Sequence, residues 1–218
     1  MDFNATDKQI RDIIVYLVEN YIAMDQNFPN ARGGVIGLKS RDLSYMLKDR
    51  PYFEVYKICA QNHDYHIQLL DGALIQFHYV FDGDKGEILK HRLNYLPHPD
   101  LESYCENPDF EKEHHGDLLF ADIKTQSSIQ FPIRFDFDAS DTVFREKWHS
   151  RSHLTLGNVA NCRIPVLSAI SPNRFMDFIL RCFYSKKYEA DLKEFDCGLS
   201  FAASLNNSEK SLLHLGFE

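Results

Sequence analysis

Residues 66–81, HIQLLDGALIQFHYVF, decide the fold class, because polar and apolar side chains alternate along them with the period of a β-strand. Asp71-Gly72 divides the segment, and this dipeptide accepts the positive φ angles of a two-residue type I′ turn. A second turn spans Asp82 to Gly86, and residues 87–96, EILKHRLNYL, then alternate in the same way. The pattern predicts a three-stranded antiparallel meander.

The two faces of this meander differ in polarity. A mainly apolar face is expected to pack against helices, and a polar face is expected either to be solvated or to receive RNA or a partner protein. The apolar face carries Ile75, Phe77, Tyr79, Phe81, Leu89, His91, Leu93 and Tyr95. The polar face carries His66, Gln68, Gln76, His78, Lys90, Arg92 and Asn94.

A helix is predicted before the meander. Thr6-Asp7-Lys8-Gln9 has the form of a capping box, and apolar residues follow at helical spacing as far as Met24. Residues 27–30 break this helix, and the glycine-rich residues 32–37 are expected to form a flexible connection, because no strand precedes them and no G-K-[ST] closes a phosphate-binding loop. A second helical region is predicted from 40 to 60, interrupted by Pro51.

After the meander, further strands and one helix complete the fold. Strands are predicted at 129–138, 153–157 and 161–166, and Ser171-Pro172 starts a buried helix through about Tyr184. The fold class is therefore α+β, an antiparallel sheet (the meander plus further strands) with helices packed on one face. We expect a single domain over 1–218, with an N-terminal helical part at about 5–60 and a sheet-plus-helix core at about 65–188.

Charge is distributed unevenly along the chain. The net charge of −8 argues against a protein whose whole surface grips nucleic acid. Residues 131–187 nevertheless carry nine basic and five acidic side chains, so a local basic field can steer an anionic ligand. Residues 100–122 carry eight acidic side chains and one lysine, which predicts an irregular surface excursion.

Localisation is predicted from three features. The five cysteines form no C-x-x-C pair, the first residues lack the basic and apolar regions of a signal peptide, and no stretch approaches the roughly 20 apolar residues of a membrane helix. We therefore expect a cytoplasmic protein with free thiols and no membrane contact.

The segment Arg134-Phe135-Asp136-Phe137-Asp138 carries the first candidate functional residues. On a strand, Arg134, Asp136 and Asp138 line one face about 7 Å apart. Two carboxylates at this spacing can hold Mg²⁺ or Mn²⁺, and Arg134 can hold a phosphate beside them. The alternative is a ladder of ion pairs, in which Asp136 pairs with Arg134 or, across the strands, with Arg163.

His149 and His153 are the second candidate pair. A strand would separate them by roughly 13 Å, which disfavours a shared zinc ion unless the segment is a turn. Separate roles as general acid and general base suit this spacing, with Arg151 or Arg163 stabilising a pentacoordinate phosphate. A metal-free ribonuclease works in this way and needs a substrate 2′-hydroxyl. The alternative is that each histidine is a hydrogen-bonded structural residue.

Several of these segments together resemble a family of bacterial proteins classed as a domain of unknown function. The resemblance is carried by R-F-D-x-D at 134–138, S-H-L-x-x-G at 152–157, R-I-P at 163–165 and the segment 172–184. Family members carry a proline in the turn before the second histidine, where this chain has Ser150 and Arg151. The resemblance implies a bacterial or mobile-element origin and no particular activity. More loosely, the layout is similar to small toxins of bacterial toxin–antitoxin pairs.

The leading functional hypothesis is a nucleic-acid-processing enzyme of a bacterial defence or toxin–antitoxin system that cleaves RNA phosphodiesters. The predicted catalytic residues are Asp136, His149 and His153, and the predicted substrate-binding residues are Arg134, Arg151 and Arg163. Asp136 and Asp138 are the predicted ligands if Mg²⁺ or Mn²⁺ takes part. The second hypothesis is a non-catalytic subunit that docks a protein partner from the same operon, and the third is a small-ligand sensor.

Overall fold

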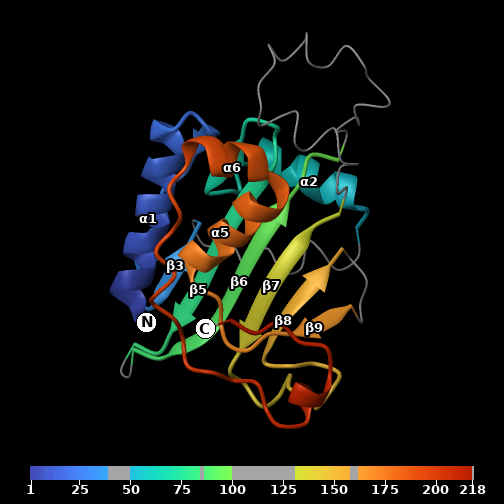
Figure 1. The fold of residues 1–218 in the computed structure, drawn as a ribbon. Coiled ribbons are helices and arrows are strands. Elements are labelled where there is room, and N and C mark those ends of the chain that lie inside the picture. The colour runs from blue at the N-terminus through green and yellow to red at the C-terminus, as the bar shows by residue number, and fades with distance from the viewer. Residues whose placement is uncertain (39–49, 84–85, 100–130, 158–161, 218) are drawn as a thin grey trace.

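An antiparallel sheet lies at the centre of the computed structural model, which describes residues 1–38, 50–83, 86–99, 131–157 and 162–217 (Figure 1). Its strands lie in the order β1-β4-β5-β6-β7-β8-β9, and β2 and β3 also belong to it. The α+β class with a meander and further strands is therefore confirmed. The bounds are β4 Ile67–Leu69, β5 Leu74–Phe81, β6 Ile88–Leu96, β7 Ile133–Asp138, β8 Ser152–Leu156 and β9 Arg163–Pro165.

The N-terminal part contains three strands where we predicted none. β1 (Ala23–Gln26) pairs with β4, and β2 (Asn30–Arg32) and β3 (Val35–Gly37) form a hairpin whose second strand pairs with β5. The flexible connection predicted at 32–37 is therefore wrong. Gly33 and Gly34, with φ +60° and +78°, make the turn that joins β2 to β3. Three-residue strands are too short to show an alternating pattern, which explains the error.

The first helix, α1 (Phe3–Glu19), starts and ends earlier than predicted. Its N-cap is Asp2, whose side chain accepts a hydrogen bond from the Ala5 amide, and Thr6 instead donates its hydroxyl to the Asp2 carbonyl at 2.7 Å. The earlier start brings Phe3 edge-on to Phe81, with ring centroids 5.7 Å apart. Met24 lies outside the helix, in β1.

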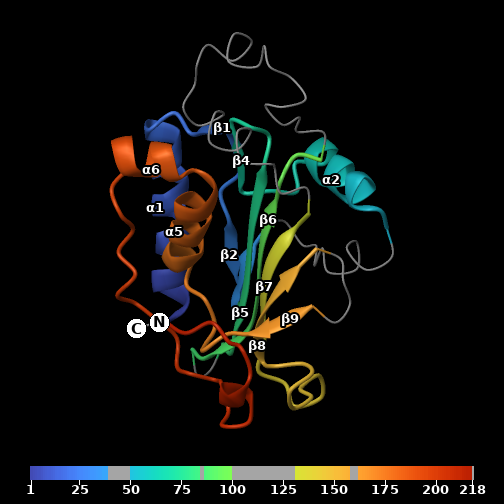
Figure 2. The same cartoon turned by 45° about the vertical axis from the view of Figure 1, so that its right-hand side comes forward.

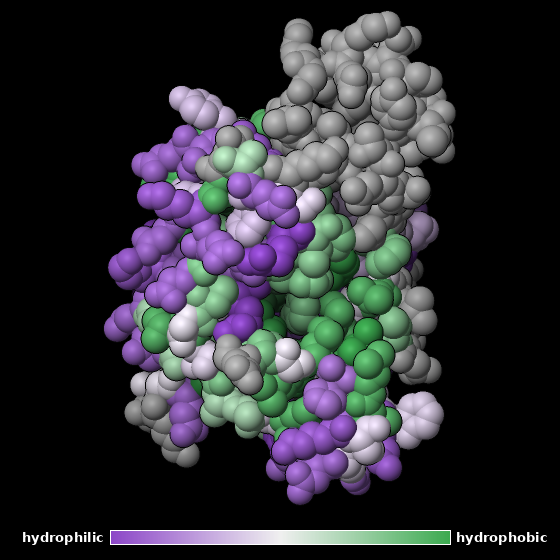
Figure 3. Space-filling view, in the orientation of Figure 1, coloured by the Kyte–Doolittle hydropathy of each residue, from purple (hydrophilic) through white to green (hydrophobic). Residues whose placement is uncertain are grey.

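On one face of the sheet lie α1 and the two helices that follow β9 (Figure 2). α5 (Pro172–Phe183) begins at its predicted N-cap, Ser171, and is followed by α6 (Ser185–Asp191). The ring of Phe175 lies edge-on to Phe77 of β5 and to Phe135 of β7, at 5.8 and 6.0 Å between centroids. Figure 3 shows apolar side chains gathered beside α5, over β7 and β8. The core thus lies between α1, α5 and this face.

The helix α2 (Tyr52–Gln61) lies on the opposite face, so the prediction that the helices share one face is wrong for α2 (Figure 2). Val55 and Cys59 of α2 belong to a separate buried cluster that includes Leu74 and Leu96, which alternate with the residues of the main core. This small cluster covers one end of the face that we predicted to be polar.

Part of the predicted polar face is buried as a consequence. His66, Gln76 and Asn94 are among the buried polar residues. Asn94 donates its side-chain amide to Gln76 Oε1 at 2.7 Å, and the His66 ring accepts the Phe77 amide at 3.1 Å. These three side chains therefore serve the sheet and are not open to a partner.

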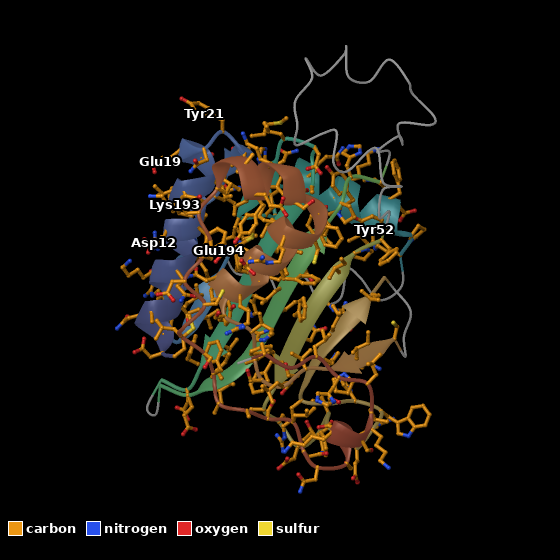
Figure 4. All side chains as sticks on the ribbon, in the orientation of Figure 1. Asp12, Glu19, Tyr21, Tyr52, Lys193 and Glu194 are labelled. Carbon is orange, nitrogen blue, oxygen red and sulfur yellow. The ribbon has the colours of Figure 1, made fainter. Side chains whose placement is uncertain are left out.

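The C-terminal segment returns along α1. The Lys193 amide donates to the Tyr16 hydroxyl at 2.6 Å, and Figure 4 shows Lys193 and Glu194 on the same side of the molecule as Asp12. A short 3₁₀ helix follows at Glu209–Ser211. Among the described residues no helix is both long enough and apolar enough to cross a membrane.

Some predictions fall outside the described residues. These are the first part of the 40–60 helix, the acidic excursion at 100–122, the start of the 129–138 strand and the turn after Gly157. The single-domain organisation stays a prediction.

The β2–β3 turn supplies a test of the corrected N-terminal architecture. A Cβ at Gly34 would lie 2.7 Å from the Phe81 carbonyl oxygen, whereas a Cβ at Gly33 would meet nothing within 4 Å. We expect Gly33→Ala to lower the free energy of unfolding by about 1–2 kcal/mol, the cost of left-handed backbone. Gly34→Ala should cost roughly 1–3 kcal/mol more, because the backbone must move. Urea unfolding measures both, and equal losses would contradict the pairing of β3 with β5.

Candidate functional site

The strand register brings three polar residues into one row, two of them predicted site residues and the third their neighbour on β6. Arg92 of β6 lies opposite Asp136 of β7, and His153 of β8 lies opposite Asp136 on its other side. Directly opposed side chains on one face of a sheet have Cβ atoms about 4.5–5.5 Å apart. Arg134 is two residues before Asp136 and shares its face. The pairing of β6, β7 and β8 therefore places Asp136 in the middle of a cluster of polar side chains.

Asp136 is buried and fully engaged by arginine. It is 8% exposed, its Oδ1 accepts Arg92 Nε at 2.7 Å, and its Oδ2 accepts Arg134 Nε at 2.5 Å. Burial alone would raise the pKa of this carboxyl, but the two guanidiniums outweigh burial and lower the pKa to about 2. Asp136 is therefore an anion at neutral pH.

His153 is a buried, neutral imidazole. Its Nδ1 lies 2.9 Å from the Ser150 carbonyl oxygen, which only accepts, so Nδ1 carries the proton. Its Nε2 lies 3.7 Å from Asp136 Oδ2. Burial lowers the pKa of His153 to about 4 although Asp136 acts in the opposite direction. At neutral pH His153 has a proton-accepting Nε2 and is not a general acid.

His149 meets His153 at the start of β8. The two rings are 5.0 Å apart and nearly perpendicular, so the separation of roughly 13 Å expected for a strand is wrong. The chain bends at Arg151, between the two histidines, and His149 itself closes a tight turn in which the Arg145 and His149 backbones exchange hydrogen bonds of 3.0 and 2.7 Å. His149 is half-buried, and burial followed by the charge of Arg163 lowers its pKa.

Arg163 and Thr155 extend the cluster towards β9. Thr155 lies opposite Arg134 on one side and opposite Arg163 on the other. Arg163 lies diagonally across from His153 on the same sheet face, and its charge lowers the pKa of both His149 and His153. Thr155 Oγ1 is buried and makes no hydrogen bond within the described part of the chain. A buried hydroxyl between two arginines is suited to donate to an anion.

Arg151 belongs to a different contact set. Its guanidinium donates to the Ala139 carbonyl and to the Asp141 carboxylate, and it lies 5.3 Å from the centre of the Phe144 ring. Arg151 therefore braces the loop between β7 and β8, and it is not among the side chains that contact Asp136.

Asp138 lies beyond Asp136 on the same face and pairs with Lys90 at 3.0 Å. It borders a cavity of about 480 Å³ that lies along the polar face. Each predicted metal-binding carboxylate thus contacts a cation, and the described residues contain no group of three or more potential ligands. The metal site stays a prediction. The cavity is lined by His78, Val80, Leu89, Lys90, Asp138, Ala139 and Ser140.

Sequence reasoning did not assign Arg92 or Thr155 to the site. The period of residues 87–96 placed Arg92 on the polar face, but its contact with Asp136 depends on how β6 and β7 are paired. Residues 97–132 separate these two strands, and no turn motif fixes their register. Thr155 gave no signal, because a threonine in a strand is ordinary.

Comparison with known proteins identifies a family for this chain. The model of the family described as "Uncharacterized conserved protein (DUF2290)" matches residues 21–217. The chain belongs to this family. The match confirms the resemblance carried by the R-F-D-x-D, S-H-L-x-x-G and R-I-P segments, and it gives no support to the looser likeness to toxins. No curated protein and no solved structure matches the chain.

The ion cluster predicts a large stability effect in this member of DUF2290. Asp136→Asn removes the buried anion that the partly buried Arg92 and Arg134 share, and we expect it to lower the free energy of unfolding by about 3–5 kcal/mol. Asp138→Asn is the matched control, because its Lys90 pair is more exposed, and it should cost roughly 1 kcal/mol or less. Urea unfolding at pH 7 compares the two, and similar losses would show that Asp136 is not the anchor of the cluster.

Three buried histidines predict acid sensitivity. Burial lowers the pKa of His66 and of His91 to about 3, and that of His153 to about 4. Because these values lie below that of an unfolded histidine, about 6.5, the unfolded chain binds more protons and stability falls as the pH drops from about 6.5 towards 4. Each histidine should contribute roughly 1.4 kcal/mol per pH unit in that window. Urea unfolding at pH 7, 6 and 5 measures the slope, and unchanged stability across this range would contradict the neutral, buried states.

Proposed function

We propose that the cluster around Asp136 binds a phosphodiester of RNA and that the protein cleaves it without a metal ion. The observation that carries the proposal is that two arginines, Arg92 and Arg134, converge on one buried carboxylate, Asp136, beside the paired rings of His149 and His153. Guanidinium groups held beside two histidines favour the approach of an anion.

Guanidinium groups suit a phosphate in this setting. Arg92 and Arg134 each use Nε to bind Asp136. A guanidinium has four further N–H donors in a planar fork that matches phosphate oxygens. Because Asp136 holds these side chains before any ligand arrives, little rearrangement is needed when negative charge develops on a pentacoordinate phosphate.

His149 is the proposed general base. Its lowered pKa keeps the imidazole neutral at pH 7, and it is less buried than His153. In the proposed step His149 removes the proton of the 2′-hydroxyl, the 2′-oxygen bonds to phosphorus, and the bond from phosphorus to the 5′-oxygen breaks. The proton then passes from His149 to the leaving 5′-oxygen, which yields a 2′,3′-cyclic phosphate. His153 keeps the His149 ring in place through their edge-on contact.

We place this activity in a bacterial defence or toxin–antitoxin system, acting on RNA in the cytoplasm beside a protein partner from the same operon. This wider setting is supported only by the layout of the sequence. A second candidate function has one observation in its favour: both oxygens of Asp136 are already bound, as in a purely structural ion cluster. The protein would then be a non-catalytic subunit of such a complex.

Replacement of His149 separates the two functions. His149→Ala should abolish cleavage of a ribonucleotide oligomer and leave the melting temperature nearly unchanged, because the ring is only half-buried. Cleavage by the wild type should persist in EDTA and stop when the 2′-hydroxyl at the cleaved position is replaced by hydrogen. His63→Asn is the control, because His63 is an exposed histidine in the left-handed conformation that asparagine also tolerates.

The assay uses gel separation of labelled oligomers. A folded wild-type protein that turns over no RNA, with or without Mg²⁺ or Mn²⁺, would contradict the ribonuclease proposal and favour the second candidate function, a non-catalytic subunit.

A further inference from the structure

The turn before His149 presents the chain's only tryptophan to solvent. Trp148 is 75% exposed, whereas the adjacent His149 is half-buried and Ser150 is buried. Trp148 is thus an exposed residue next in the chain to His149, whose ring contacts His153 in the cluster around Asp136. We infer that Trp148 is a stacking platform for an unpaired nucleobase, next to the phosphate that the cluster binds. This inference rests on the proposed function.

The backbone holds Trp148 in a defined place. The Trp148 amide donates to the Arg145 carbonyl at 3.0 Å, and the His149 amide donates to the same carbonyl at 2.7 Å. Lys147 has φ +65°, an unusual conformation for a residue with a side chain. Such backbone persists where its surroundings enforce it and is frequent at ligand-binding sites. The same turn therefore positions the indole and the imidazole.

The rest of the loop is braced as well. Arg151 ties the loop to itself through the Ala139 carbonyl, the Asp141 carboxylate and the Phe144 ring. The Ser140 and Thr142 hydroxyls add a further contact at 2.7 Å. A loop that is ordered before binding loses less entropy when a ligand arrives, so the stacking energy is retained as affinity.

Charge around the indole matches a nucleic acid. Arg145 and Lys147 are exposed on the same turn, with Glu146 between them. The charge of Arg163 lowers the pKa of the neighbouring His149. Aromatic rings combined with a basic surface are the usual means of holding single strands, because every base has a face that stacks. A duplex hides these faces, so the predicted ligand is single-stranded RNA.

Fluorescence tests the inference directly, because Trp148 is the only tryptophan. The probe is a single-stranded 2′-O-methyl oligoadenylate, which lacks the nucleophile and is not cleaved. We expect saturable quenching of the tryptophan emission by this probe. Inorganic phosphate should bind the cationic residues with little quenching, and a duplex of the same length should bind more weakly than the single strand.

Variants separate stacking from the phosphate site. By anisotropy of a labelled probe, Trp148→Ala should weaken binding roughly 5- to 150-fold, the usual contribution of one stacked base. Trp148→Phe should retain most of the affinity. Phe53→Ala is the matched control, because Phe53 of α2 is also an exposed aromatic residue, at 49%, and should bind as the wild type does.

The outcomes distinguish the inference from the proposed function. Binding that requires Arg163, tested with Arg163→Gln, but that is unaffected by Trp148→Ala would overturn the stacking role and leave the phosphate site standing. A wild type that binds neither the oligoadenylate nor phosphate would overturn both. Protection of Trp148 from acrylamide quenching by a partner protein, with no oligonucleotide binding, would also overturn the inference and assign the turn to a protein interface.

Discussion

One buried carboxylate, Asp136, holds the middle of the polar sheet face together. A charge at this depth persists because Arg92 from β6 and Arg134 from β7 each donate to one of its oxygens. The residues on either side of Asp136 in the strand, Phe135 and Phe137, are apolar and lie in the core on the other face of the sheet. A register shift of one residue would bring Asp136 into that core. The ion cluster and the apolar core therefore require the same pairing of β6, β7 and β8.

The same constraint shapes the chemistry of the cluster. Asp136 fixes two arginines, and the β8–β9 pairing brings Arg163 and Thr155 beside them. Burial keeps the histidines neutral, so imidazole nitrogens beside the arginines can accept a proton. An anion with a nearby hydroxyl, such as a ribonucleotide phosphodiester, fits this combination. The loop that carries His149 also carries Trp148, which links the base-binding surface to the reacting group.

Local patterns predicted the elements that local energetics determine. Alternation located β5, β6, β7 and β8, and Ser171-Pro172 located the start of α5 because capping is a short-range effect. β1, β2 and β3 were missed because three or four residues show too little periodicity. β1 and β3 also pair with β4 and β5, which are distant in sequence. The position of α2 on the opposite face was also missed. Leu74 and Leu96 are ordinary strand residues in the sequence, and only the folded structure shows that α2 packs against them.

The site was predictable to the extent that one strand defined it. Arg134, Asp136 and Asp138 share a face by period alone. The partner Arg92 depends on a long-range register, and the approach of His149 to His153 depends on a bend at residue 151. Arg151 was predicted to bind the phosphate because of its position in the sequence. In the structure its guanidinium instead contacts Ala139 and Asp141 of the loop between β7 and β8.

The most direct test of a phosphate-binding cluster is the salt dependence of oligoribonucleotide affinity. Single strands lose counterions with a slope of about −0.7 per neutralised phosphate in a plot of log affinity against log salt concentration. Two phosphates held by the arginines of the cluster predict a slope of roughly −1.4 for the wild type, and a slope less steep by about 0.7 for Arg163→Gln. An affinity that does not change with salt, or a slope that Arg163→Gln leaves unaltered, would show that the arginines around Asp136 serve the fold alone.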